Sequence, residues 1–244
     1  MIRSKQPNSP WYLIHHHILN MSSSTDSTAK HSATTLLSSI LRATEEKIIP
    51  LTAAGVSSGS KLFGAAILSR ADLSPITVAT NNEKVSPLLH GEINCIQQFF
   101  SSHPDPATRP NPKECVFFAT HEPCSLCLSG ITWSGFDEFY YLFTYEDSRD
   151  LFAIPYDIDI LEQVFRVPGP SDTQETLKER PLYNKKNKFF TAKSLADLLD
   201  EIEGEEERKK WEGEIKRVKD LYNGLSETYQ EGKKAGAESA SVWK

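Results

Sequence analysis

The segments His90-Gly91-Glu92 and Pro123-Cys124-Ser125-Leu126-Cys127 are the most informative parts of this 244-residue sequence. Cys124 and Cys127 are three residues apart, so both thiols fall on one face of a helical turn and can bind one metal ion. Pro123 is typical of a first helical turn, where the helix dipole lowers the pKa of a thiol. With His90 as a third ligand, the set is one that zinc prefers.

Three protein ligands leave one tetrahedral position of zinc for water, whose pKa falls to near 7 when it is bound. Glu92, two residues after the histidine, is placed to transfer protons there as a general acid and base. The alternative is a closed structural zinc site, with a fourth ligand supplied by Cys95, Cys115 or His121. We expect instead that Cys95 and Cys115 are small buried hydrophobic residues.

Apolar periodicity around these segments predicts strands that alternate with helices. Such a pattern indicates an α/β sheet that is covered on both faces. We expect a first helix over residues 34–49, ended by Pro50, and a hairpin of two strands at 62–68 and 76–80. The further elements expected are a helix that carries His90 and ends by residue 103, a strand at 115–120, a helix from about Pro123, a strand at 138–143 and a short helix at 158–165.

The chain divides into four expected regions by composition. Residues 1–30 form a disordered or loosely attached arm, and residues 31–168 the zinc-binding domain. Residues 169–191 read as a polar, partly basic linker, and residues 192–244 as a charged helical extension that begins near Ala192.

Composition limits the compartment and the partners. The apolar run Trp11–Ile14 meets His15–His17 at once, so we expect no secretory signal, and we assign the histidines no function. No run approaches the roughly 20 apolar residues that span a membrane. Four cysteines without an export signal predict the reducing cytoplasm or nucleus. The net charge of −6 disfavours a surface built to bind nucleic acid.

The two metal-binding segments match the His-x-Glu and Pro-Cys-x-x-Cys signature of zinc-dependent base deaminases. The sequence resembles the cytidine and deoxycytidylate deaminase superfamily, especially the cytosine, guanine and tRNA adenosine deaminase branch. The resemblance runs from about Thr34 to Phe165. It rests also on residues outside the two segments: Phe63-Gly64-Ala65, Pro87, Asn94, Thr120, Glu122, Gly130-Ile131 and Trp133.

The resemblance implies a three-layer α/β/α fold with a mixed five-stranded sheet, and it implies frequent dimers. It assigns zinc to His90, Cys124 and Cys127 and the proton transfers to Glu92. Substrate contacts are expected from Gly91, from His121, and from an asparagine that precedes the histidine. Asn81 and Asn82 both compete for that last position because the loop before His90 is shorter than in relatives. Ser86 replaces a customary Asp, and residues 169–244 have no matched counterpart.

The resulting prediction is a hydrolytic deaminase that converts the exocyclic amine of a small nucleobase or nucleoside to a carbonyl and releases ammonia. One alternative is a partner subunit with a deaminase fold and no turnover, which the presence of Glu92 disfavours. Another is a deaminase of tRNA or other nucleic acid, for which the basic and aromatic segment Lys178–Lys193 would have to hold phosphates. A homodimer is possible.

Overall fold

The structure is a computed structural model that describes residues 31–236. The predicted N-terminal arm, the expected absence of a secretory signal and the residues His15–His17 fall outside the described residues, as do positions 237–244. Within residues 31–236, no helix is long and apolar enough to cross a membrane.

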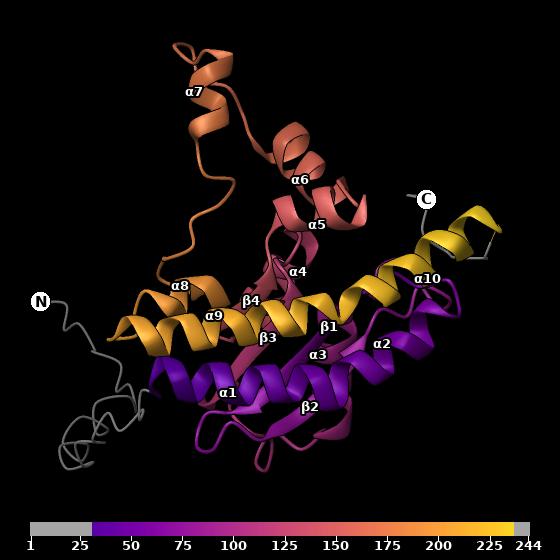
Figure 1. Cartoon of the computed structure of the whole chain (residues 1–244), viewed down its shortest axis with the longest axis vertical. Helices are drawn as coiled ribbons and strands as arrows, with labels where there is room; N and C mark the ends of the chain where they lie inside the picture. The colour runs from indigo at the N-terminus through magenta and orange to yellow at the C-terminus, as the bar shows by residue number, and fades with distance from the viewer. Residues whose placement is uncertain (1–30, 237–244) are drawn as a thin grey trace, which may run out of the picture.

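A mixed five-stranded sheet forms the centre of the protein, in the order β2-β1-β3-β4-β5 (Figure 1). The strands are β1 (Gly64–Ser69), β2 (Pro75–Thr80), β3 (Cys115–His121), β4 (Glu138–Phe143) and β5 (Thr191–Ser194). β1 runs antiparallel to β2 and to β3, whereas β3, β4 and β5 are parallel. The predicted hairpin and the predicted mixed sheet are confirmed.

Helices cover both faces of the sheet and give three layers (Figure 1). One face carries α1 (Ala33–Ala43), α2 (Ile49–Val56), α8 (Leu195–Leu199), α9 (Glu205–Asp220) and α10 (Tyr222–Lys234), and the other carries α3 (Gly91–Ser102) and α4 (Ser125–Ser134). Successive strand side chains point to opposite faces, so Phe118 packs beneath the first group and Phe117 beneath the second. The predicted α/β/α fold class with a C-terminal helical extension is confirmed.

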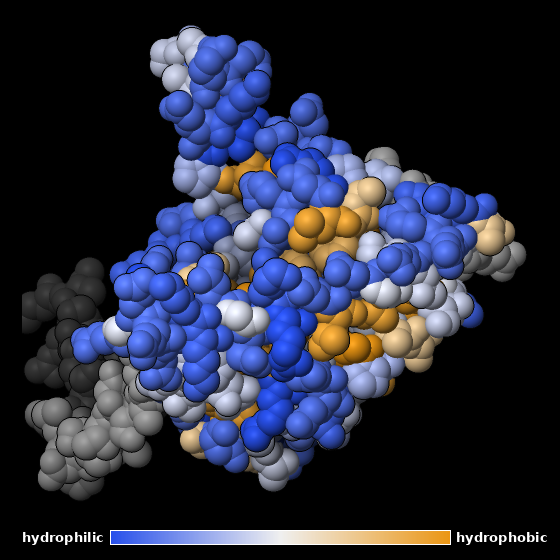
Figure 2. Space-filling model, in the orientation of Figure 1, coloured by the Kyte–Doolittle hydropathy of each residue, from blue (hydrophilic) through white to orange (hydrophobic). Residues whose placement is uncertain are grey.

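Shorter elements follow β4 and form the rim of the molecule. They are α5 (Tyr145–Phe152), α6 (Tyr156–Ile160), the π-helical turn Leu161–Phe165 and α7 (Gln174–Glu179); a 3₁₀ turn, Pro112–Glu114, precedes β3. α7 projects away from the sheet (Figure 1), and its surface is hydrophilic (Figure 2).

Two expectations about element boundaries were wrong. Pro50 does not end the first helical segment. A π-helical turn over Thr44–Ile48 precedes it and places Pro50 in the first turn of α2. The missing N–H of proline costs little at that position. The helix expected from Ala192 is preceded by β5, whose alternating burial comes from parallel pairing with β4. The short sequence Thr-Ala-Lys-Ser has no strand signature, so only its tertiary neighbour reveals it.

Candidate metal centre and catalytic cavity

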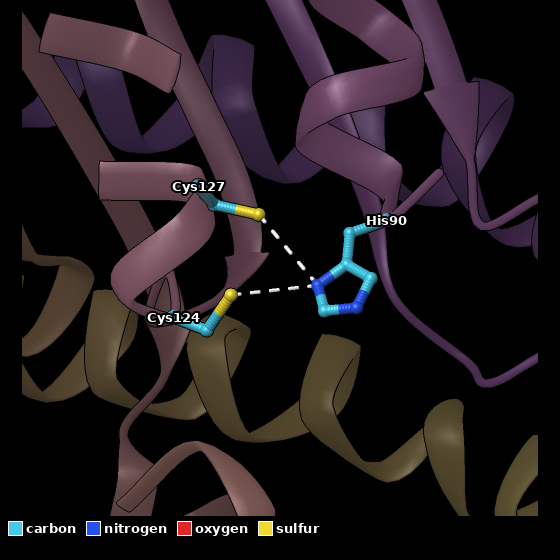
Figure 3. A group of neighbouring side chains, drawn as sticks. All are labelled: His90, Cys124 and Cys127. Carbon is cyan, nitrogen blue, oxygen red and sulfur yellow. Dashed lines mark hydrogen bonds between the residues drawn. The ribbon is translucent and has the colours of Figure 1, made fainter. Parts of the chain in front are cut away.

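Three side chains from two helices meet at the carboxyl end of β3, as Figure 3 shows. His90 Nδ1 lies 3.4 Å from Sγ of Cys124 and 3.7 Å from Sγ of Cys127. Among the residues described, these three form a group whose ligand atoms all lie within 4.8 Å of one another. The sequence prediction that His90, Cys124 and Cys127 converge is therefore met by the geometry.

The spacing of the three atoms fits a zinc ion. Zn–S and Zn–N bonds of about 2.3 and 2.0–2.1 Å at a tetrahedral angle place nitrogen and sulfur about 3.6 Å apart. The two observed separations, 3.4 and 3.7 Å, lie on either side of that value. The three residues therefore fit a zinc ion, which two sulfurs and one imidazole nitrogen would hold.

The ends of two helices present the ligands. His90 is the N-cap residue of α3 and Cys124 is the N-cap residue of α4, so both helix dipoles place their positive ends at the site. A hydrogen bond from Cys127, with His90 adding to it, holds the pKa of Cys124 well below its usual range. Burial lowers the pKa of His90, but the Cys124 sulfur outweighs burial and raises it to about 9. Cys124 is thus set to be a thiolate, the form that binds metals.

Glu92 lies in the first turn of α3, next to the metal ligands. Its side chain is buried, and its Oε2 atom has no hydrogen-bond partner within residues 31–236. Burial raises the pKa of this carboxyl to about 7. A carboxyl with a near-neutral pKa and an unpaired oxygen is suited to accept and return protons.

Asn81 and Gly91 hold the start of α3. Oδ1 of Asn81 accepts a hydrogen bond of 2.5 Å from the backbone N–H of Gly91. Nδ2 of Asn81 is buried without a partner in the described part of the chain, which leaves a donor beside the metal ligands. Asn82 is only half-buried, and its backbone N–H donates to Leu89. Of the two candidates, the geometry favours Asn81.

His121 lies in the aromatic core and does not line the cavity described below. Its ring is 2% exposed and contacts Phe63, Phe143, Phe152 and Tyr222. Nδ1 is hydrogen-bonded to the Thr120 hydroxyl at 2.9 Å, and burial holds the pKa of the imidazole well below its usual range. Nε2 of His121, like Nδ2 of Asn81, is buried without a partner among the described residues, and the contact of His121 with substrate stays a prediction.

Neither remaining cysteine reaches the metal centre. Cys95 is buried on α3, where its Sγ lies 3.6 Å from the carbonyl of Thr77, and Cys115 Sγ lies 3.4 Å from the carbonyl of Asn111. Both are buried among apolar side chains, as expected. The geometry therefore favours an open three-ligand site over a closed structural one.

A cavity of about 290 Å³ opens onto His90 and Cys124. Its other walls are mostly apolar: Phe63, Pro87, Leu88, Leu126, Ile154 and Ile160, with Ser125 and Tyr156. Two charged side chains complete it, Lys61 and Asp157, which sequence analysis missed. Lys61 forms a buried ion pair with Glu83, at 2.6 Å, and burial raises the pKa of Asp157 to about 8.

Comparisons with known proteins agree with this site. Residues 41–143 match the family described as the cytidine and deoxycytidylate deaminase zinc-binding region. No curated protein matches the chain.

Among solved structures, guanine deaminase from Bacillus subtilis is 22% identical, with 57% of this chain and 82% of that chain covered and a TM-score of 0.41. Guanine deaminase from Nitrosomonas europaea is 19% identical, with 70% and 80% covered and a TM-score of 0.41. A tRNA:A34 deaminase is 19% identical, with 41% and 74% covered and a TM-score of 0.35.

The matched region contains β1 to β4 and all three ligands of the metal centre. Residues 41–143 are thus similar to the cytidine and deoxycytidylate deaminase zinc-binding region, and the three residues that could hold the metal lie within that match.

Proposed function

We propose that the protein is a hydrolytic deaminase of a small free nucleobase or nucleoside. The observation that carries this proposal is the cavity of about 290 Å³ whose lining includes His90 and Cys124. Ligand pockets of about 300–1,000 Å³ take drug-sized molecules, so this cavity suits a single base with little attached.

The reaction replaces an exocyclic amine with a carbonyl and releases ammonia. Zinc held by His90, Cys124 and Cys127 would supply an activated water. Glu92 would take one proton from the water and pass it to the ring nitrogen as the oxygen adds to the ring carbon. It would then take the remaining hydroxyl proton and pass it to the amine, which leaves as ammonia while the carbonyl forms. Asn81 Nδ2 donates a hydrogen bond to the substrate, and Gly91 contributes through its backbone by holding Asn81. Asp157 provides a polar contact in an otherwise apolar cavity.

The charges around the cavity support a small substrate. Its single basic side chain, Lys61, is bound to buried Glu83. Residues 178–186 of the basic segment Lys178–Lys193 line a different cavity. Its basic side chains there, with Arg166, face the carboxylates of Glu122, Glu146, Glu162 and Glu179. A polynucleotide deaminase needs a basic channel that leads to its pocket, and this arrangement does not offer one.

The partner-subunit alternative is disfavoured by Glu92. The carboxyl is buried, with one oxygen unpaired in the described structure, and this arrangement costs stability. Retention of such a group is expected where it has a function. A homodimer stays a prediction, which light scattering of the purified protein can check. A cytoplasmic or nuclear location also stays a prediction, which cellular localisation can check.

Ammonia release measured with zinc-loaded protein tests the proposal. The panel is cytosine, guanine, adenine and their nucleosides, beside tRNA and single-stranded DNA. We expect turnover of at least one free base or nucleoside. Turnover of polymers alone, with a steep salt dependence, would contradict the proposed substrate class.

A further inference from the structure

We propose that Tyr183 and Lys185 are positioning residues for the metal centre, which they reach through Glu122. Both belong to the basic and aromatic segment that follows α7, far in sequence from the cysteines. The inference concerns zinc retention and does not depend on which substrate is turned over.

Glu122 is the point of contact. Glu122 is 4% exposed and directly precedes Pro123-Cys124 in the chain. Oε1 accepts a hydrogen bond of 2.9 Å from the Tyr183 hydroxyl and lies 3.2 Å from Nζ of Lys185. Oε2 accepts a hydrogen bond of 3.3 Å from the backbone N–H of Tyr145. The segment after α7 thus supplies two side-chain partners of this buried carboxylate.

A second contact fixes the loop that carries Cys124. The Tyr145 hydroxyl donates to the carbonyl of Pro123 at 2.5 Å, one residue before the Cys124 ligand. The rings of Tyr145 and Tyr183 lie 6.3 Å apart and nearly perpendicular, so the two tyrosines support each other. Two consecutive residues before Cys124 are therefore fixed from the same side.

The segment that carries Tyr183 and Lys185 is itself anchored to the sheet. The carbonyl of Lys185 accepts a hydrogen bond of 2.8 Å from the N–H of Ala192 in β5, and Lys186 forms a bridge with Thr191. Lys185 Nζ also donates to the Tyr141 hydroxyl on β4. These contacts anchor Lys185 and the chain beside Tyr183 to the sheet, so the two side chains can limit the positions that Cys124 samples.

Groups that orient metal ligands strengthen binding, and their loss costs about 10–100-fold in metal affinity. We therefore expect Tyr183→Phe to weaken zinc binding by about tenfold or more. Loss of the hydroxyl leaves Glu122 Oε1 with Lys185 alone and frees the Pro123-Cys124 loop. Lys185→Met should act in the same direction, while Lys185→Arg should restore most of the affinity.

The experiment measures zinc dissociation constants of the full-length protein by competition with a chromogenic chelator. Tyr140→Phe is the matched control, because its hydroxyl also donates to a carboxylate, Glu138, at the opposite end of the sheet. Lys188→Met controls for loss of one positive charge in the same segment. Thermal unfolding of the metal-free variants separates weaker folding from weaker zinc binding.

Weaker zinc binding in Tyr183→Phe and Lys185→Met, with both controls unchanged, would support the proposal. Zinc affinities within twofold of wild type in both variants would overturn it, as would an equal loss in Tyr140→Phe. If Tyr183→Phe does not fold, Lys185→Met decides the question, since that side chain is half exposed.

Discussion

Substitution of Gly91 by alanine tests how tightly the start of α3 is packed against β1. Gly91 separates the His90 ligand from Glu92, and its N–H donates to Asn81. A Cβ atom at this position would lie 2.8 Å from Gly64 Cα and 2.9 Å from the carbonyl oxygen of Phe63. Both contacts are with backbone, so no side chain can rotate away to relieve them.

The size of the effect follows from these distances. Ordinary contact begins near 3.4 Å, so the helix start must retreat from β1 by about 0.6 Å. Overpacking of this kind costs roughly 1–3 kcal/mol of stability. A displacement on the order of 1 Å at reacting groups costs about 10²-fold in rate. We expect Gly91→Ala to lower kcat/KM by about 10–100-fold, because His90 and Glu92 both move.

Steady-state ammonia release, zinc content and thermal unfolding measure these effects. Gly213→Ala on α9 is the matched control, because its Cβ would meet nothing within 4 Å. Alanine there should stabilise the helix by about 0.5–1 kcal/mol and leave turnover unchanged. A Gly91→Ala protein with turnover within threefold of wild type and unchanged stability would refute the packing argument.

Two further predictions concern buried charge. The imidazole of His121 must stay neutral when folded, whereas the unfolded chain takes up a proton below its ordinary pKa of about 6.5. Stability is therefore lost as pH falls through 6.5, so between pH 7.5 and 5 wild type should lose more stability than His121→Phe in denaturant unfolding. Parallel pH profiles of the two proteins would contradict this. Lys61→Met removes the ion-pair partner of buried Glu83 and leaves its carboxylate with the backbone N–H of residue 61. The variant should lose about 3 kcal/mol of stability, and adding Glu83→Leu should recover much of the loss. A cost below about 1 kcal/mol would contradict this prediction.

Local spacing made the metal centre predictable. The Cys-x-x-Cys interval and the His-x-Glu pair place their side chains through the geometry of single helix turns, so convergence at one edge of the sheet needed only the α/β pattern. The position of Glu92 was equally predictable, because its distance from His90 is set by the same helix turn.

The cavity walls were not predictable in this way. Lys61, in the loop before β1, and Asp157, in α6, line the same cavity, and no periodicity links residues so far apart in sequence. The burial of His121 could not be foreseen, because the sequence cannot show that Tyr222 of α10 packs against its ring. β5 was missed because its four residues become a strand only beside β4.

Zinc content and ammonia release of Glu92→Gln, measured together, test the central claim most directly. The amide preserves the shape of the side chain but cannot transfer protons. We predict about one zinc per chain in both proteins, an intact fold, and turnover reduced by at least about 10²–10⁴-fold in the variant. Activity within about tenfold of wild type, or a wild-type protein that is active without zinc, would contradict the account.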